Sequence, residues 1–135
     1  MSSVLRRCAG YSGGVNDAPI LYMVRVWIAP EGGERYLHYL ESQHMAQVIR
    51  EPGFLWARKC RLEQPDEKGW PGYLLIYGLD SQAALDAYLV SPARDRFWKE
   101  LEAFGDVQHA ERFYGAVDFA LDVEGILGPA AGGSD

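Results

Sequence analysis

The residue with the clearest capacity for chemistry is His44, in the stretch YLESQHMAQVIREPGFLW, residues 39–56. Apolar residues flank it at helical spacing, at Leu37, Leu40 and Val48, so the imidazole lies on the apolar side of a predicted helix. A histidine in that position is either a core residue with one hydrogen-bond partner or part of the wall of a ligand cavity. In the second case it could take up or release a proton near neutral pH.

Arginines within predicted strands are the second group of candidates, at Arg25, Arg58 and Arg112. An arginine on an apolar strand face is costly unless its charge is paired. Its guanidinium could bind a carboxylate or phenolate of a ligand through two hydrogen bonds. We assign Arg25 as a catalytic candidate beside His44 and Arg58 as a substrate contact. The alternative for all three is an ion pair with an acidic side chain, for which the candidates are Glu63, Glu111 and Asp118.

Aromatic residues make up 13% of the chain, with 4 Trp and 8 Tyr. Large rings that carry one polar atom are frequent in ligand pockets and interfaces, and they also fill cores. Composition therefore leaves both roles open for each ring. The aromatic candidates for substrate contacts are Tyr22, Trp27, Trp56, Tyr77, Tyr88 and Trp98.

The composition argues against several kinds of partner and site. A net charge of −6 disfavours nucleic acid, which requires a concentrated basic surface. The two cysteines, Cys8 and Cys60, lack the spacing of a zinc site, and His38 and His44 point about 120° apart on an ideal helix. We therefore expect no metal site. No phosphate-binding loop, dinucleotide fingerprint or nucleophile elbow occurs.

The chain contains no apolar run near the roughly 18 residues of a membrane helix, and no secretory signal is evident. We expect no membrane association. The sparse use of cysteine is typical of a reducing compartment, which predicts a cytoplasmic protein.

The hydrophobic pattern predicts an α+β domain over residues 20–121, with flexible tails at 1–19 and 122–135. Strands are expected at 20–29, 54–63, 73–79 and 107–121, a helix at 31–50, and a second helix after Asp80 that Pro92 interrupts and Gly105 ends. The order β-α-β-β-α-β is that of the ferredoxin-like fold, an antiparallel four-stranded sheet with its helices on one face.

The first strand is apolar on both faces. Tyr22, Val24, Val26 and Ile28 share one face, and Leu21, Met23, Arg25 and Trp27 share the other. The second strand is expected to place Phe54, Trp56, Arg58, Cys60 and Leu62 on a common face. Because helices cover only one side of such a sheet, the open side requires a partner, and the simplest partner is a second copy. We expect a homodimer through the open sheet face.

Three segments resemble the dimeric α/β-barrel superfamily: QHMAQVIREPGF, YLLIYGLDSQAALDAYL and RDRFWKELEAFG. Within that superfamily the chain is most similar to an uncharacterised domain-of-unknown-function family, over roughly residues 20–121. The resemblance implies two sheets packed face to face in a dimer, with a cavity between the sheet and helices of each subunit. Members include cofactor-independent monooxygenases, haem-degrading enzymes, lactone isomerases, EthD-like proteins and lyases, so the fold does not select one function.

These observations support two functions. The first is a small-molecule enzyme without a bound cofactor, of monooxygenase, isomerase or lyase type, with His44 as acid or base and an aromatic or polyketide-like substrate. The alternative is a non-catalytic dimer that binds a metabolite or is associated with stress. Haem is disfavoured because the haem-degrading relatives use a histidine on the second helix, and residues 81–104 contain none.

Overall fold

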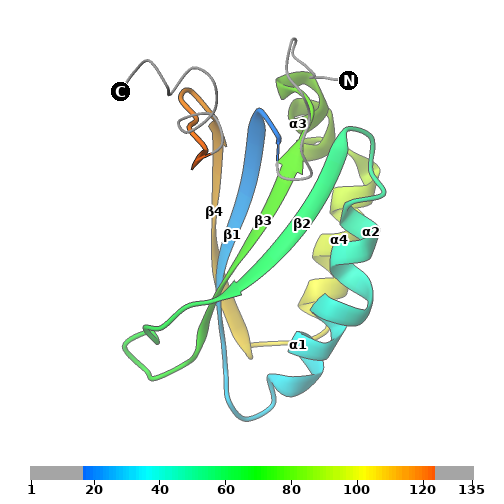
Figure 1. The fold of residues 1–135 in the computed structure, drawn as a ribbon. Coiled ribbons are helices and arrows are strands. Elements are labelled where there is room, and N and C mark those ends of the chain that lie inside the picture. Colours follow the sequence, from blue (N-terminus) through cyan, green and yellow to red (C-terminus); the bar gives the residue numbers. More distant parts are fainter. Residues whose placement is uncertain (1–16, 124–135) are drawn as a thin grey trace.

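The computed structural model describes residues 17–123. The greater part of both predicted tails, 1–19 and 122–135, lies outside the described residues. Four strands form one antiparallel sheet in the order β2-β3-β1-β4 (Figure 1). They are β1 (Ile20–Ile28), β2 (Phe54–Arg61), β3 (Gly72–Leu79) and β4 (Gln108–Ala116).

The helices lie together on one side of this sheet (Figure 1). The first helical segment is continuous through α1 (Glu34–Tyr39), the π-helical turn η1 (Leu40–His44) and α2 (Met45–Val48). The second comprises α3 (Gln82–Leu89) and α4 (Pro92–Glu102). The element order and the one-sided helical layer confirm the predicted ferredoxin-like fold.

The break between α3 and α4 follows from local sequence. The Ser81 hydroxyl accepts a hydrogen bond from the Ala84 amide at the start of α3, and the Ser91 hydroxyl accepts one from the Arg94 amide at the start of α4. Pro92 occupies the first turn of α4, where a missing amide hydrogen costs nothing. Two capped helices therefore replace one long helix, as the sequence predicts.

The central strand β1 sets the two faces of the sheet through its register. Val24 lies opposite Leu75 of β3 and Arg112 of β4, and all three side chains face the helices. Arg25 lies opposite Leu74 and Glu111 and is exposed on the other face. The buried core lies between the sheet and the helices, because only there do two apolar layers meet.

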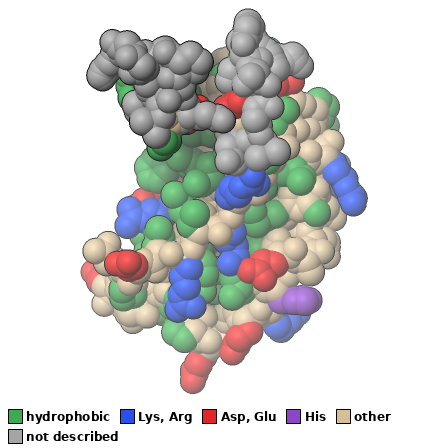
Figure 2. Space-filling view, viewed as in Figure 1, with side chains coloured by type: hydrophobic (Ala, Val, Ile, Leu, Met, Phe, Trp, Pro, Cys, Tyr) green, Lys and Arg blue, Asp and Glu red, His purple; other side chains and the backbone are tan. Residues whose placement is uncertain are grey.

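The open face of the sheet carries many apolar side chains. Figure 2 shows hydrophobic side chains gathered over the strands, with acidic and basic ones interspersed. Trp27 lies against Gly72 at one end of β3, and Trp56 lies against Gly78 at the other end. Between these rings the register places Met23 beside Ile76 and Phe113.

Two details of the predicted strands are wrong. A register irregularity between Phe54 and Trp56 turns Phe54 into the core, whereas Trp56 and Arg58 stay on the open face, so the five residues do not share a face. The last strand ends at Ala116, not at residue 121. It ends there because the neighbouring strand β1 begins at Ile20, and just beyond it the Val117 amide donates a hydrogen bond to the Pro19 carbonyl oxygen.

The turn at Pro52-Gly53 packs against α3 and depends on glycine. Gly53 has φ +87°, and a Cβ there would lie 2.3 Å from the Ala84 Cβ. Gly69 has a similar φ of +83°, but a Cβ there would meet nothing within 4 Å. At both positions a side chain would strain the left-handed backbone, but only at Gly53 would it also clash with a neighbouring residue.

We expect Gly53→Ala to lower the free energy of unfolding by about 2–4 kcal/mol, since left-handed backbone strain and overpacking add. Gly69→Ala is the matched control and should cost only about 1–2 kcal/mol. Urea denaturation of both variants measures the difference. Equal losses would contradict the packing of the turn against α3.

Candidate functional site

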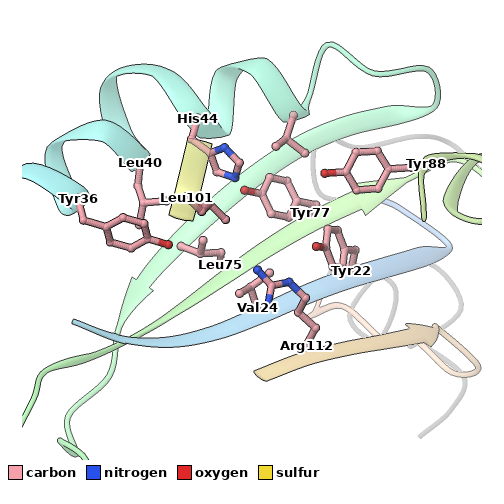
Figure 3. Close-up of a pocket in the computed structure, with 11 residues that line it drawn as sticks. Tyr22, Val24, Tyr36, Leu40, His44, Leu75, Tyr77, Tyr88, Leu101 and Arg112 are labelled. Carbon is pink, nitrogen blue, oxygen red and sulfur yellow. The ribbon is translucent and has the colours of Figure 1, made fainter. Parts of the chain in front are cut away.

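A cavity lies between the sheet and the helices (Figure 3). Polar groups from both layers converge on it: hydroxyls of Tyr22, Tyr36, Tyr77 and Tyr88, the imidazole of His44 and the guanidinium of Arg112. The rest of its wall is aliphatic, formed by Val24, Leu40, Val48, Leu75 and Leu101. The cavity has a volume of about 20 Å³, which is enough for about one water molecule.

The π-helical turn aligns the first helical segment with this cavity. Its buried residues, Tyr36, Leu40, His44 and Val48, are each separated by four positions. In an ideal α-helix a spacing of four drifts by about 40° at each step, so His44 would turn away from the sheet. The wider turn η1, with its i→i+5 hydrogen bonding, absorbs the drift, and such turns are frequent at functional sites.

His44 is 8% exposed and is surrounded by rings. Phe97 meets its imidazole edge-on at 5.2 Å between centroids, and Tyr39 stacks on it at 5.5 Å. The Nδ1 atom lies 3.5 Å from the Tyr39 hydroxyl. The ring points into the cavity (Figure 3).

Burial lowers the pKa of His44 to about 4, with a smaller lowering by Arg112, and the Glu100 carboxylate opposes both. His44 is therefore a neutral imidazole at pH 7, with a free lone pair on one nitrogen. A neutral imidazole in a closed cavity can accept a proton, which is the first requirement of a general base.

The tyrosines form a ladder across three strands. The Tyr22 ring stacks between Tyr77 at 5.5 Å and Tyr114 at 5.4 Å, and Tyr88 of α3 packs against it at 5.8 Å. Burial raises the pKa of Tyr36 to about 12 and raises the pKa values of Tyr77 and Tyr88 further, so these hydroxyls stay protonated.

Among the described residues, none forms a hydrogen bond with the Tyr22, Tyr36, Tyr77 or Tyr88 hydroxyls. Polar atoms inside a protein are normally paired, and atoms that converge unpaired on a cavity are those that meet water or a ligand. Together these hydroxyls offer a ligand several hydrogen bonds.

Arg112 brings the positive charge of the site. It comes from β4, at the register position opposite Val24, and its guanidinium lies 4.4 Å over the Trp98 ring. No carboxylate within residues 17–123 forms an ion pair with it. The cation is thus held by an aromatic face and is available to an anionic ligand.

A second small cavity continues from the first toward α4. Both share Tyr22, His44, Tyr88, Leu101 and Arg112, and the second adds Arg94, Phe97 and Trp98. Trp98 is 41% exposed, and Arg94 reaches the Tyr114 hydroxyl at 3.5 Å. The second cavity therefore reaches the surface between α4 and β4, where Trp98 is exposed.

The structure brings together His44, Tyr22, Tyr77, Tyr88 and Trp98 from the sequence-based candidates. It places the others on the opposite face of the sheet: Arg25, Trp27, Trp56 and Arg58. There Arg25 lies over Trp27 and Arg58 over Trp56. Arg25 cannot act with His44 in one cavity of a subunit, because the sheet separates them.

The sequence listed Arg112 among the strand arginines without giving it a role in the site, and it did not single out Tyr36, Tyr39 or Glu100. The alternation of β4 offered one signal, because Ala110, Arg112 and Tyr114 share a face. Which face meets the helices depends on the register with β1, which no local pattern gives. Tyr39 and Glu100 are 61 positions apart, and only the packing of α4 on α1 joins them.

Within residues 17–123, no group of three or more His, Cys, Asp or Glu side chains is placed to hold a metal ion. In the same part of the chain no helix has the length and apolar character needed to cross a membrane. His109 lies outside the cavity, where it pairs with Asp66 at 2.9 Å and stacks on Trp27.

Comparison with family models decides the family. A model described as a domain of unknown function, DUF4286, matches residues 19–113. The chain belongs to this DUF4286 family. A search of curated proteins gives no match.

Solved structures show the same fold. SnoaB, a cofactor-independent oxygenase from Streptomyces nogalater, has a TM-score of 0.51 at 20% identity over 78% of this chain and 98% of its own. An antibiotic biosynthesis monooxygenase-like protein from Deinococcus radiodurans gives 0.59 at 20% identity, covering 77% and 97%. A dimeric ferredoxin-like protein from an uncultured marine organism gives 0.58 at 12%, covering 76% and 96%. At these low sequence identities the similarity establishes only the fold of this DUF4286 protein and says nothing of its activity.

The lowered pKa of His44 makes stability depend on pH. In the unfolded chain His44 takes up a proton near pH 6.5, whereas in the folded protein it does so near pH 4. Between these pH values the unfolded state binds more protons than the folded state. The contribution of His44 to the free energy of unfolding therefore falls by about 3 kcal/mol as the pH drops from 6.5 to 4.

We expect His44→Gln to remove this part of the pH dependence of the free energy of unfolding. Urea denaturation of the variant and of wild type at a series of pH values measures the difference. His38→Gln, an exposed histidine of the same helical segment, is the control and should keep the wild-type slope. A parallel profile for His44→Gln and wild type would show that His44 is not buried as a neutral imidazole.

Proposed function

We propose that this protein is an acid–base enzyme without a resident cofactor that deprotonates a hydroxylated aromatic or polyketide-like substrate. The observation that carries the proposal is the convergence of a neutral buried imidazole, an arginine without a carboxylate partner and several unpaired tyrosine hydroxyls on one cavity. The fold neighbours agree with this class, since SnoaB is a cofactor-independent oxygenase.

His44 is assigned as the base. A substrate hydroxyl or acidic C–H bond within hydrogen-bond reach would give its proton to the imidazole, and the electron pair would remain on the substrate as a phenolate or enolate. Removal of a proton is a first step that oxygenation, isomerisation and elimination have in common.

Arg112 is assigned to the anion that forms. Its guanidinium is fully charged, and in a cavity of low dielectric it stabilises a developing oxyanion far more than it would in water. Arg112 thereby takes the role that the sequence assigned to Arg25. The rings of Tyr22 and Tyr77, which stack on each other, line the cavity and offer a substrate ring an aromatic wall.

An aromatic ring does not fit this cavity of about 20 Å³, because a protein cavity known to bind benzene measures about 150 Å³. The substrate would therefore enter along the seam of α4 and β4 by displacing the side chains of Trp98 and Arg94. Both side chains line the second cavity, and Trp98 is 41% exposed.

The alternative is a non-catalytic metabolite-binding protein, in which the same polar groups would only orient the ligand. The neutral imidazole beside an arginine favours the enzyme, because this pair can both remove a proton and stabilise the resulting anion. Binding of a phenol without proton transfer and without turnover would favour the alternative.

Hydroxynaphthalenes and hydroxyanthraquinones are suitable probes because their absorption changes on ionisation. We expect wild-type protein to bind such a probe near neutral pH and to show the phenolate band. The reason is that Arg112 stabilises the phenolate, and the bound phenolate in turn favours the His44 imidazolium, which burial disfavours in the empty cavity. His44→Gln should bind the same probe in its neutral form, with no phenolate band. An unchanged phenolate spectrum in His44→Gln would remove His44 from the role of base.

Arg112→Gln should weaken binding of the ionised probe by about 10- to 100-fold, the range expected when one charged hydrogen bond is lost. Arg25→Gln is the matched control, because the same substitution lies on the opposite face of the sheet. Titration calorimetry gives both affinities. Equal losses in the two variants would place the anion site elsewhere.

We also propose that the protein is a homodimer through the open sheet face. That face is apolar at its centre, at Met23, Ile76 and Phe113, and it carries charges of both signs, Arg25 and Glu111. A two-fold axis would offer each charge to its opposite on the partner. An exposed alternating row, Val117, Phe119, Leu121 and Val123, continues from the end of β4 and adds further apolar surface to bury.

Phe113→Glu should convert the dimer to a folded monomer, since a carboxylate would be buried at the centre of the interface. Phe113 is 44% exposed in the subunit, so the subunit itself should tolerate the change. Val90→Glu, at an exposed position after α3, is the control. Sedimentation velocity at micromolar concentration measures the mass, and a monomeric wild type would refute the dimer.

A further inference from the structure

The Tyr39 hydroxyl lies between His44 and a carboxylate from another helix. It donates a hydrogen bond to Glu100 Oε1 at 2.5 Å and lies 3.5 Å from His44 Nδ1. Its ring stacks on the imidazole with 27° between the planes. Glu100 belongs to α4, so the contact also ties α4 to the first helical segment.

The π-helical turn makes this contact available. Tyr39 and His44 are five positions apart, and in an ideal α-helix such residues point about 140° away from each other. In a π-helical turn the hydrogen bonds run from i to i+5, so residues five apart lie one above the other. The turn η1 spans this interval, from Leu40 to His44. The turn therefore directs His44 toward the cavity and brings the Tyr39 hydroxyl close to Nδ1 of His44.

The direction of the hydrogen bonds determines the tautomer of the imidazole. The Tyr39 proton is used on Glu100, so the Tyr39 oxygen can only accept a hydrogen bond from His44. That requires a hydrogen on Nδ1 and leaves the lone pair on Nε2, at the other side of the ring.

We propose that Tyr39 and Glu100 are positioning residues that hold His44 as the Nδ1–H tautomer, with the Nε2 lone pair directed into the cavity. This inference rests on the proposed role of His44 as a base and specifies which of its nitrogens receives the proton. The substrate proton would move to Nε2, while the hydrogens on Nδ1 and on the Tyr39 oxygen stay where they are.

Glu100 contributes a second effect, through space. When His44 has accepted a proton, the imidazolium lies between Arg112, which opposes its charge, and Glu100, which stabilises it. Burial also disfavours the imidazolium. The Glu100 carboxylate is therefore the group that raises the pKa of His44 and makes proton transfer to it less costly. The titratable and charged groups around His44 come from every element packed against it. They are Tyr36 and Tyr39 on the same helical segment, Glu100 and Arg94 on α4, Tyr88 on α3, and Tyr22, Tyr77 and Arg112 on the strands.

Nitrogen-15 NMR of the histidine side chains tests the tautomer without any substrate. The full-length chain contains 3 histidines, and His44→Gln identifies the signals of His44. At pH 7 we expect wild-type His44 to be neutral with its hydrogen on Nδ1. In Tyr39→Phe the Nδ1–H loses its acceptor, and the population should shift to Nε2–H. Tyr36→Phe removes a cavity hydroxyl of the same helical segment and should leave the tautomer unchanged.

Glu100→Gln provides a second readout should Tyr39→Phe fail to fold. Its carboxamide oxygen can still accept from Tyr39, so the tautomer should persist while the midpoint of the His44 titration falls below the wild-type value. Glu102→Gln, on the same helix and exposed, is the control and should leave the midpoint unchanged. With a probe that turns over, both Tyr39→Phe and Glu100→Gln should lower kcat by about 10- to 100-fold, and KM should change little.

An Nε2–H tautomer in wild type, an unchanged tautomer in Tyr39→Phe, or an unchanged midpoint in Glu100→Gln would overturn this inference. The proposed base could still be correct in those cases, since the phenolate spectrum measures it separately. Conversely, an Nδ1–H tautomer in a protein that never ionises a bound phenol would refute the enzyme and leave the positioning contact in place.

Discussion

The two-residue period of the central strand β1 is the constraint on which the arrangement of the site depends. Because β1 is paired on both sides, its alternation is carried to β3 and β4 by the register, and each side chain of these strands is assigned to one face. Helices cover one face only (Figure 1). A shift of a single position therefore decides whether an arginine meets the cavity, as Arg112 does, or lies on the open face, as Arg25 does.

The cavity is an expensive part of the core. An imidazole, a guanidinium and tyrosine hydroxyls lie where a protein of this size would ordinarily place aliphatic side chains, and burial disfavours each charged form. The protein meets this cost by keeping His44 neutral, by laying Arg112 on Trp98 and by stacking the tyrosine rings across strands. Violations of core-packing rules that are concentrated at one place are typical of functional sites.

The fold alone leaves the chemistry open. The same fold occurs in a cofactor-independent oxygenase and in other proteins at 12 to 20% identity, so the shared architecture does not select a function. The chemistry proposed for this DUF4286 protein depends on the side chains in its cavity. The π-helical turn supports that chemistry, because it directs His44 inward and brings Tyr39 within reach of it.

The sequence by itself determined the element order, the capped break at Pro92, the inward position of His44 and the apolar character of both sheet faces. These follow from local signals: hydrophobic period, capping serines and Pro-Gly turns. Only the tertiary structure decided which arginine belongs to the cavity, because register is a long-range pairing. It also decided that Trp27 and Trp56 lie on the open face, and that Glu100 meets Tyr39 across 61 positions of sequence. Such contacts are set by packing between elements, and no spacing along the chain encodes them.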